Sequence, residues 1–362
     1  MTRFVLGFGC VAAAALLTQA CSSYFGDGPD PSRDGRVDAG AAGAASIEPT
    51  QLVSGVSVNA LALDADTVYF TSNQGLAKVA KQGGSAVPLG GFSQLNGLAV
   101  DARAIYAVNS NGALFSVHKN GTSTTTLSTA TCGGGAGAVA ISADSAFFST
   151  GPYLRNTPIS GGTTSDLTSN VWQAGGQASA ARIALDAQNA YYIGSALTGG
   201  LGALYGVAQA GSGMSCVAQL APGTRLASAK GTIGALAGDG TRLYFTDLTS
   251  NGLSPVLVVS VIVAPSLAHA TVIDLGKITA EGNNNTQTAG NALASDGTHL
   301  YFGGFSGIYR VLVGGPTCSA TALPCSAPEL VVTNAMPTAL AVDTDSLYYG
   351  DQNGNGLKKV AK

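Results

Sequence analysis

The stretch LALDADTVYF at residues 61–70 decides the fold, because the chain repeats its pattern seven times. Each copy has a short apolar segment that ends at an aspartate or a serine, then a brief turn, then a second segment with one or two aromatic residues. The other copies begin at Leu98, Val139, Ile183, Leu236, Leu293 and Leu340. Repeats of roughly 40–50 residues that are made of strands are typical of a β-propeller, in which each repeat forms one blade. The sequence therefore predicts an all-β fold, a seven-bladed β-propeller.

The first copy predicts four antiparallel strands in each blade. From the ring axis outward they are NALALD at 59–64, TVYFTSN at 67–73, GLAKVAKQG at 75–83 and SAVPLGG at 85–91. Gly75, Gly83 and Gly84 stand where tight turns require a positive φ. We expect the recurring aspartates to cap backbone N–H groups in turns, and the aromatic residues to pack between blades. An active site needs each group only once, so recurrence in nearly every blade favours these structural roles.

The seventh copy runs out after its third strand, GLKKVAK at residues 356–362. A matching segment occurs at the other end of the chain, where EPTQLVSGVSVNALALD from Glu48 is similar to APELVVTNAMPTALAVD from Ala327. This similarity predicts that residues 51–54 form the outermost strand of the seventh blade. Such a strand closes the ring and removes an exposed sheet edge.

Residues 1–20 have the features of a signal peptide: Arg3 precedes an apolar run at residues 4–17 that is too short to cross a bilayer of about 30 Å. The run leads into LTQAC, which ends at Cys21 and resembles the lipobox of bacterial lipoproteins, with Gln19 as a departure from it. The resemblance implies that Cys21 carries a lipid and that Ser22 directs the protein to the outer membrane. The alternative is an ordinary secretory signal cleaved near Ala20.

Residues 21–48 are predicted to form a flexible tether, followed by the propeller at residues 49–362. The tether is rich in Gly, Ala and Asp and has almost no bulky apolar residues, so it cannot bury a core. Part of it matches the first positions of a calcium-binding loop, through Asp30, Ser32, Asp34 and Asp38. Ala41 stands where the final acidic ligand belongs, so at most a weak Ca²⁺ site is expected, and no other cofactor.

Composition and motifs exclude several functions. A net charge of −3 is opposite to the basic surface that nucleic acid requires and argues against electrostatic binding to anionic lipid, which leaves the lipid anchor as the membrane contact. The histidines His118, His269 and His299 have no partner at metal-binding spacing, so no metal site is predicted. No hydrolase, metalloprotease or nucleotide-binding motif occurs, and no catalytic residue is predicted.

Four cysteines follow the lipidation site. Thiols usually pair in an oxidising envelope, and the short spacing of Cys318 and Cys325 in one loop predicts a disulfide between them. Cys132 and Cys216 belong to blades that are not neighbours. They are either buried thiols or are brought together by an insertion.

The loops that lead into blades 4, 5 and 6 are long, and by propeller geometry they share one face with the loops between second and third strands. Length concentrated on one face of neighbouring repeats is typical of a binding face. The candidate binding residues on this loop-rich face are Trp172, Arg182, Arg225, Lys230, Asp247, Glu281 and Asn284. Trp and Arg are frequent anchors of interfaces. Neutral drift of loops in a glycine-rich protein is the alternative explanation.

The motif YFTD at residues 244–247, with the weaker versions VYFTS at 68–72 and LYYGD at 347–351, resembles the YWTD repeat. The folded part is similar to YWTD- and NHL-like propellers of predicted bacterial envelope lipoproteins of unknown function. Animal YWTD receptors have six blades, so their ligand-binding residues do not transfer to this chain. The resemblance implies the fold and an envelope location, but no activity, because propellers carry many functions.

These observations favour a monomeric, membrane-anchored propeller in the bacterial envelope, on its periplasmic side or at the cell surface. It would act without catalysis as a binding or scaffold module for a protein or a glycan. The alternative is a lactonase- or lyase-like enzyme with its site at the central channel, where a ring of similar carboxylates could hold one cation. A passive surface protein is a third hypothesis.

Overall fold

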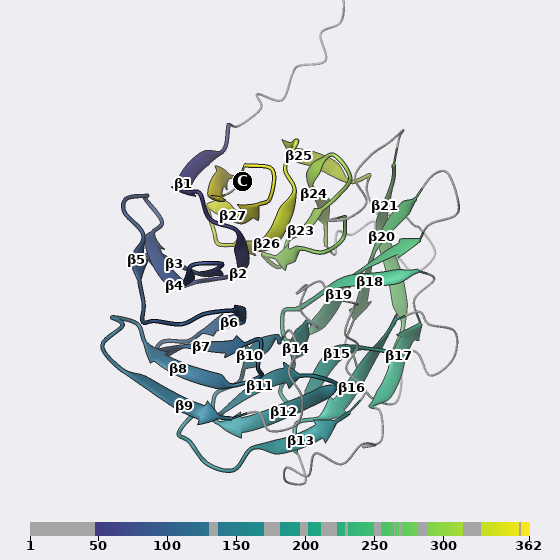
Figure 1. Ribbon diagram of the computed structural model, residues 1–362. Helices are drawn as coiled ribbons and strands as arrows, with labels where there is room; N and C mark the ends of the chain where they lie inside the picture. Colours follow the sequence, from purple (N-terminus) through teal and green to yellow (C-terminus); the bar gives the residue numbers. More distant parts are fainter. Residues whose placement is uncertain are drawn as a thin grey trace, which may run out of the picture. The chain divides into compact units, whose positions relative to one another are not determined.

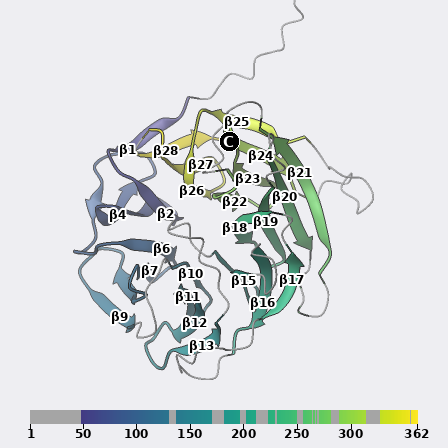
Figure 2. The ribbon, with the colours of Figure 1, turned by 45° about the vertical axis from the view of Figure 1, so that its right-hand side comes forward.

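The computed structural model describes residues 48–129, 137–169, 182–195, 202–210, 223–228, 231–249, 255–263, 265, 267, 270–280, 289–313, 327–354 and 356–362. Within these ranges the regular secondary structure is entirely β, in seven sheets of four antiparallel strands. The sheets follow one another around a ring (Figures 1 and 2). The predicted seven-bladed β-propeller is therefore confirmed. The described residues include no helix that is long and apolar enough to cross a membrane.

Blades 1 to 3 follow the strand order predicted from the first repeat, with the innermost strand first in the chain. Blade 1 consists of β2 (Val58–Leu63), β3 (Thr67–Ser72), β4 (Gly75–Ala80) and β5 (Val87–Pro88). Blade 2 consists of β6 (Leu95–Val100), β7 (Ala104–Asn109), β8 (Leu114–His118) and β9 (Thr124–Ser128). Blade 3 consists of β10 (Val139–Ile141), β11 (Ser145–Thr150), β12 (Tyr153–Pro158) and β13 (Ser165–Thr168).

Blades 4 to 6 repeat this order, and blade 5 has the longest strands. Blade 4 consists of β14 (Ile183–Leu185), β15 (Asn189–Ser195), β16 (Gly202–Ala208) and β17 (Thr224–Ser228). Blade 5 consists of β18 (Thr232–Gly238), β19 (Arg242–Thr249), β20 (Val256–Val263) and β21 (Val272–Thr279). Blade 6 consists of β22 (Leu293–Ser295), β23 (His299–Gly303), β24 (Gly307–Leu312) and β25 (Glu329–Thr333).

Blade 7 joins the two ends of the propeller. Its first three strands are β26 (Pro337–Val342), β27 (Ser346–Asp351) and β28 (Gly356–Ala361), and its outermost strand is β1 (Thr50–Ser54). β1 pairs antiparallel with β28, from Thr50 opposite Lys359 to Ser54 opposite Gly356. Figure 2 shows the two strands side by side, one from each end of the colour scale. The predicted closing strand is confirmed.

The hydrophobic core lies between the blades. The described residues form seven apolar clusters, and each cluster joins two neighbouring blades. Because successive side chains in a strand point to opposite faces, the two aromatic residues of one strand serve different neighbours. Tyr69 packs toward blade 2, and Phe70 packs toward blade 7. This two-sided burial explains the apolar second strands and the low share of charged residues.

Glycine permits the tight turn between the second and third strands of blade 1. Gly75 has a φ of +108°, and a Cβ at this position would lie 2.5 Å from the carbonyl oxygen of Phe92. Gly83 and Gly84 also have a positive φ, as predicted. Only glycine adopts such conformations without a steric penalty.

The closing strand contributes Leu52 to the cluster between blades 7 and 1, where its side chain is 7% exposed beside Val58 and Leu357. Leu52→Ala is expected to lower the free energy of unfolding by about 2–4 kcal/mol, because it removes a buried side chain and leaves a cavity. Thr50→Ala, at an exposed position of the same strand, should change it by less than about 0.5 kcal/mol. Urea titrations of both variants test this expectation, and equal effects would contradict it.

Candidate functional site

The recurring aspartate organises the turn between the first and second strands of its blade. In blade 1, Oδ1 of Asp64 accepts hydrogen bonds from the backbone N–H groups of Asp66 and Thr67, and Oδ2 accepts one from the hydroxyl of Tyr69 at 2.8 Å. Five other aspartates make the same three contacts: Asp101, Asp186, Asp239, Asp296 and Asp343. Blade 3 has Ser142 in this position and Phe147 in place of the tyrosine. The predicted turn-capping role is confirmed.

This contact shifts the titration of both partners. Burial and the hydrogen bond to Asp64 raise the pKa of Tyr69 to about 12. Burial acts to raise the pKa of Asp64, but its hydrogen bonds from Tyr69, Lys119 and the backbone outweigh this effect and lower it. Tyr69 is therefore neutral and Asp64 ionised at neutral pH, which is the state that this hydrogen bond requires.

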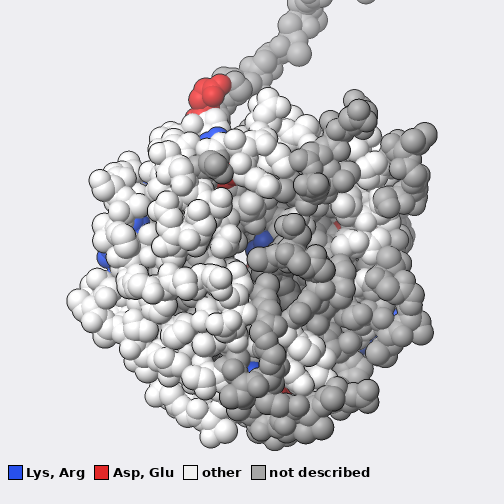
Figure 3. Space-filling view, in the orientation of Figure 1, with Lys and Arg blue, Asp and Glu red and all other residues white. Residues whose placement is uncertain are grey.

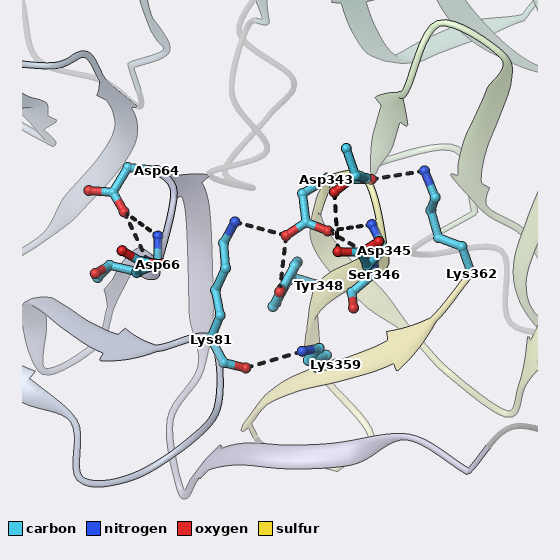
Figure 4. A network of polar contacts seen from close by, with 11 residues as sticks. Asp64, Asp66, Lys81, Asp343, Asp345, Ser346, Tyr348, Lys359 and Lys362 are labelled. Atoms are coloured by element: carbon cyan, nitrogen blue, oxygen red, sulfur yellow. Dashed lines mark hydrogen bonds and ion pairs between the residues drawn. The ribbon is translucent and has the colours of Figure 1, made fainter.

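Three of the aspartates also form an ion pair with a lysine of the following blade. Lys119 of blade 2 contacts Asp64 of blade 1 at 3.1 Å, Lys81 of blade 1 contacts Asp343 of blade 7 at 2.8 Å, and Lys362 of blade 7 contacts Asp296 of blade 6 at 2.5 Å. Each lysine directly follows the third strand of its blade. We call these three contacts the lysine latches. Figure 4 shows that Lys81 and Lys362 reach toward the Asp343 turn from opposite sides.

The latch at Asp343 is largely enclosed, with the side chains of Lys81 and Asp343 10% and 22% exposed. Burial acts to raise the pKa of Asp343, but the hydrogen bond from Lys81 and those from the N–H groups of Asp345 and Ser346 lower it to about 2. The Lys81 ammonium also lies 5.7 Å from the centre of the Tyr348 ring. Ion pairing, hydrogen bonding and a cation–π contact therefore act together where blade 1 meets blade 7.

A second contact repeats across the blade junctions and fixes the backbone of the latch residue. Lys359 donates to the carbonyl of Lys81 at 3.3 Å, as Figure 4 also shows, and Lys78 donates to that of Lys119 at 2.9 Å. In blade 3, Asn156 donates in the same way to the carbonyl of Gln209 in blade 4, at 2.8 Å. The donors share one position in the third strand, and the acceptors all follow the third strand of the next blade.

Other junctions place different residues at the latch position. Ile159 and Val313 pack into the apolar clusters of the blade 2/3 and 5/6 junctions. Gln209 donates to the carbonyl of Asp186 within its own blade, and the preceding blade has Ser142 in place of the aspartate. The described lysine latches thus occupy three consecutive junctions, 6/7, 7/1 and 1/2, which surround the blade that closes the ring.

Three of the predicted binding residues lie within the described ranges, on different parts of their blades. Arg182 precedes β14, the innermost strand of blade 4, and Arg225 is exposed on β17, the outermost strand of that blade. Asp247 is buried at the end of β19, where it accepts a hydrogen bond from the N–H of Gly231 at 2.9 Å. Arg182 donates from Nη2 to the carbonyl of Asn291 in blade 6, at 2.6 Å. Their shared binding role stays a prediction.

The other predicted sites fall outside the described residues. These are the binding residues Trp172, Lys230, Glu281 and Asn284, the lipidation site Cys21, the cysteine pair Cys318 and Cys325, the open pair Cys132 and Cys216, and the calcium-loop residues Asp30, Ser32, Asp34 and Asp38. They stay predictions.

Sequence reasoning did not single out a buried ion pair in blade 3. Nε of Arg155 donates to Oδ1 of Asp166 at 2.7 Å, and both side chains are fully buried. The two residues are register partners on β12 and β13, and the Arg155 guanidinium lies 5.0 Å from the centre of the Tyr153 ring. The sequence signal for this ion pair was an arginine and an aspartate at facing positions of two adjacent strands, since opposite charges on paired strands attract.

Among the described side chains, the metal-ligating groups do not form a cluster. No group of three or more His, Cys, Asp or Glu residues in these ranges is placed to hold a metal ion. Nδ1 of His118 contacts Oδ1 of Asn120 at an exposed turn, and the His299 ring lies beside Tyr301. All six repeated aspartates have both oxygens engaged by neighbouring donors. The repeated groups that the structure describes therefore hold the turns and blades in place.

No family model matches the chain, and no curated protein matches its sequence. Among solved structures, the chain is similar to YCF48 bound to D1 peptide, with a TM-score of 0.56 and 11% identity over 88% of this chain and 97% of that one. It is similar to the computationally designed protein Ika8, with a TM-score of 0.52 and 14% identity over 86% and 99%. It also resembles the extracellular domain of BT4673 from B. thetaiotaomicron, with a TM-score of 0.53 and 12% identity over 87% and 40%. At these identities the likeness shows the β-propeller fold alone.

Lys81→Ala is expected to lower the free energy of unfolding by about 1–3 kcal/mol, because it leaves the half-buried Asp343 without its cation. The control Lys277→Ala, at an exposed position of β21, should change it by less than about 0.5 kcal/mol. The folded-state pKa of Asp343 is lowered from 3.8 to about 2, so the latch stabilises the fold above pH 3.8 and is lost as the pH falls through about 2. Urea titrations across this range should show the parent and Lys81→Ala converging in acid. A constant difference down to pH 2 would contradict the assignment.

Proposed function

We propose that this protein is a non-enzymatic binding or scaffold propeller of the bacterial envelope. A lipid on Cys21 tethers it to the outer membrane, and its loop-rich face contacts a protein or a glycan. Nucleic acid is not a partner, and membrane contact is limited to the lipid.

One observation carries the proposal. Every repeated aspartate that the structure describes has both oxygens engaged, by its own turn, by its tyrosine or asparagine neighbour and, in three blades, by a lysine latch. A hydrolytic or cation site built on this ring of carboxylates would have to break contacts that hold the blades together. This supports a function in binding rather than the lactonase- or lyase-like alternative.

The distribution of charged residues also supports a binding surface of modest charge. On the face in Figure 3 the described charged side chains form small, separated spots among uncharged residues. Such a surface suits hydrogen-bonding and aromatic contacts better than electrostatic attraction. YCF48, whose fold is similar, is known in a form bound to D1 peptide, so a propeller of this kind is compatible with a peptide ligand.

Cross-linking in the native envelope tests the binding face. The bait is the full chain, compared with a variant that carries Trp172→Ala and Arg225→Ala. Arg103→Ala serves as the control, because Arg103 is exposed in the turn between the first two strands of blade 2, at the opposite end of the strands. A partner captured by the parent and the control, with the double variant losing about tenfold or more in yield, is the expected result.

Equal capture by all three forms, or capture by none, would refute the loop-rich face as a binding surface. Capture lost in Arg103→Ala alone would place the interface on the other face.

The anchor has its own test. Cys21→Ala is expected to abolish incorporation of labelled fatty acid and to move the protein from the membrane fraction to the soluble fraction, because a single residue carries the lipid. Cys10→Ala is the matched control and should leave both properties unchanged. Continued lipidation of Cys21→Ala would contradict the assignment of the lipobox.

A further inference from the structure

Arg182 breaks the repeat at one position. It lies four residues before Asp186, at the start of the innermost strand of blade 4. The same position in the other six blades holds the small residues Ala60, Gly97, Ala138, Ala235, Ala292 and Ala339. A long cation therefore replaces Ala or Gly once in seven copies, and a structural role in the repeat does not explain it.

The side chain of Arg182 reaches past blade 5. Its Nη2 donates to the carbonyl of Asn291, which precedes the innermost strand of blade 6. Blade 5 has Gly234 between them, where a Cβ would lie 2.5 Å from the carbonyl oxygen of Gly290 and 3.2 Å from Oδ1 of Asn291. Glycine thus lets the backbone of blade 6 approach the axis side of blade 5, and the Asn291 carbonyl comes within reach of the guanidinium. This hydrogen bond fixes the direction of the Arg182 side chain.

One nitrogen of the Arg182 guanidinium has no described partner. Nε is buried and has no hydrogen-bond partner in the described part of the chain, and no described carboxylate forms an ion pair with it. Burial lowers the pKa of Arg182 to about 10, so the group still carries its charge at neutral pH. Although Nε is buried, Arg182 as a whole is half-buried, so part of its surface is accessible to solvent. Within the described residues no carboxylate balances this enclosed cation, and burial of an unbalanced cation is unfavourable unless an anion binds to it.

At this end of the ring the blades form two sectors, which differ in the residue five positions before the aspartate. The residue five positions before the aspartate is polar in blades 6, 7, 1 and 2, namely Asn291, Thr338, Asn59 and Asn96. Two of these side chains form hydrogen bonds to the backbone of the next blade. The Thr338 hydroxyl donates to the carbonyl of Val58, and the Asn59 amide donates to the carbonyl of Leu95. In blades 3 and 5, which flank Arg182, the equivalent residues are Gly137 and Gly234, without side chains. Arg182 thus places a charged donor between two blades, 3 and 5, that have glycine at the neighbouring position.

We propose that Arg182 anchors a site for a carboxylate group at this end of the ring axis. A carboxylate has two oxygens that match the paired N–H donors of a guanidinium. It carries one negative charge, which the single cation balances, whereas the second charge of a phosphate would have no described counter-ion here. The carboxylate belongs to a small organic acid or to the C-terminus of a peptide. Arg182 is one of the residues predicted on the loop-rich face, so the site rests on that part of the proposed function, but neither Trp172 nor Arg225 is part of the site.

Calorimetric titration of the full chain in detergent tests the site with three probes: sodium acetate against sodium chloride, a short peptide with a free C-terminus, and the same peptide amidated. The parent is expected to bind acetate or the free peptide, and the amidated peptide should bind at least about tenfold more weakly than the free one. Arg182→Met should lose at least about tenfold in affinity. Arg103→Met, at an exposed arginine in the turn between the first two strands of blade 2, should bind as the parent does.

The probes separate the two sources of the carboxylate. Binding of acetate identifies a site for small acids, and binding of the free peptide without acetate identifies a peptide terminus. If Arg182→Met does not fold, as judged by circular dichroism, Arg182→Lys takes its place, and it should also bind more weakly because it keeps the charge but not the paired donors. The proposal is overturned if the parent binds neither probe beyond the chloride control, or if a folded Arg182 variant binds like the parent. Loss of partner capture in the Trp172→Ala and Arg225→Ala variant has no bearing on this outcome.

Discussion

The pairing of β1 with β28 is the interaction on which the ring depends, because no covalent bond joins the first repeat to the last. Without β1, blade 7 would expose the edge of β28, and Leu52 would be missing from the cluster at the 7/1 junction. The lysine latches lie at this junction and at the junctions on either side of it. These half-buried ion pairs hold backbone turns on neighbouring blades in fixed positions. The polar contacts are thus concentrated where the ring is joined from two distant parts of the chain.

The aspartate turn connects folding to function. One carboxylate binds two backbone N–H groups with one oxygen and a tyrosine hydroxyl with the other, so a single residue type organises six of the seven blades. Where Ser142 replaces the aspartate, the tyrosine is Phe147 and the latch position of the next blade is Gln209, which bonds within its own blade. At this junction an unpaired tyrosine hydroxyl or ammonium would be buried at a cost, and neither is present. The repeated aspartates and tyrosines are therefore committed to holding the turns and blades, which makes the residues that occur once the candidates for ligand binding.

Much of the fold could be predicted from the sequence because propeller blades repeat a local pattern. The period, the glycines at turns and the similarity of the segments from Glu48 and Ala327 indicated seven blades and their closure. The latches could not be predicted in this way. Lys119 and Asp64 are 55 residues apart, and Lys81 and Asp343 are 262 apart, so their contact depends on the radial placement of neighbouring blades. Arg182 was placed on the loop-rich face by its position beside a long loop, but its contact with Asn291 required the distance between blades 4 and 6 in the folded ring.

The asymmetry at Arg182 gives a physical reason to look for a ligand near the axis as well as on the loops. In a ring of similar blades, a charged residue that occurs in one repeat has no counterpart in the other repeats to form the same contacts. The polar sector of blades 6, 7, 1 and 2 satisfies its own donors through Thr338 and Asn59, while the sector of blades 3 to 5 leaves Nε of Arg182 without a described acceptor. Folding alone would favour alanine at this position, as in most other blades, because alanine buries no charge. Retention of an enclosed guanidinium is physically reasonable when binding of an anion offsets its desolvation.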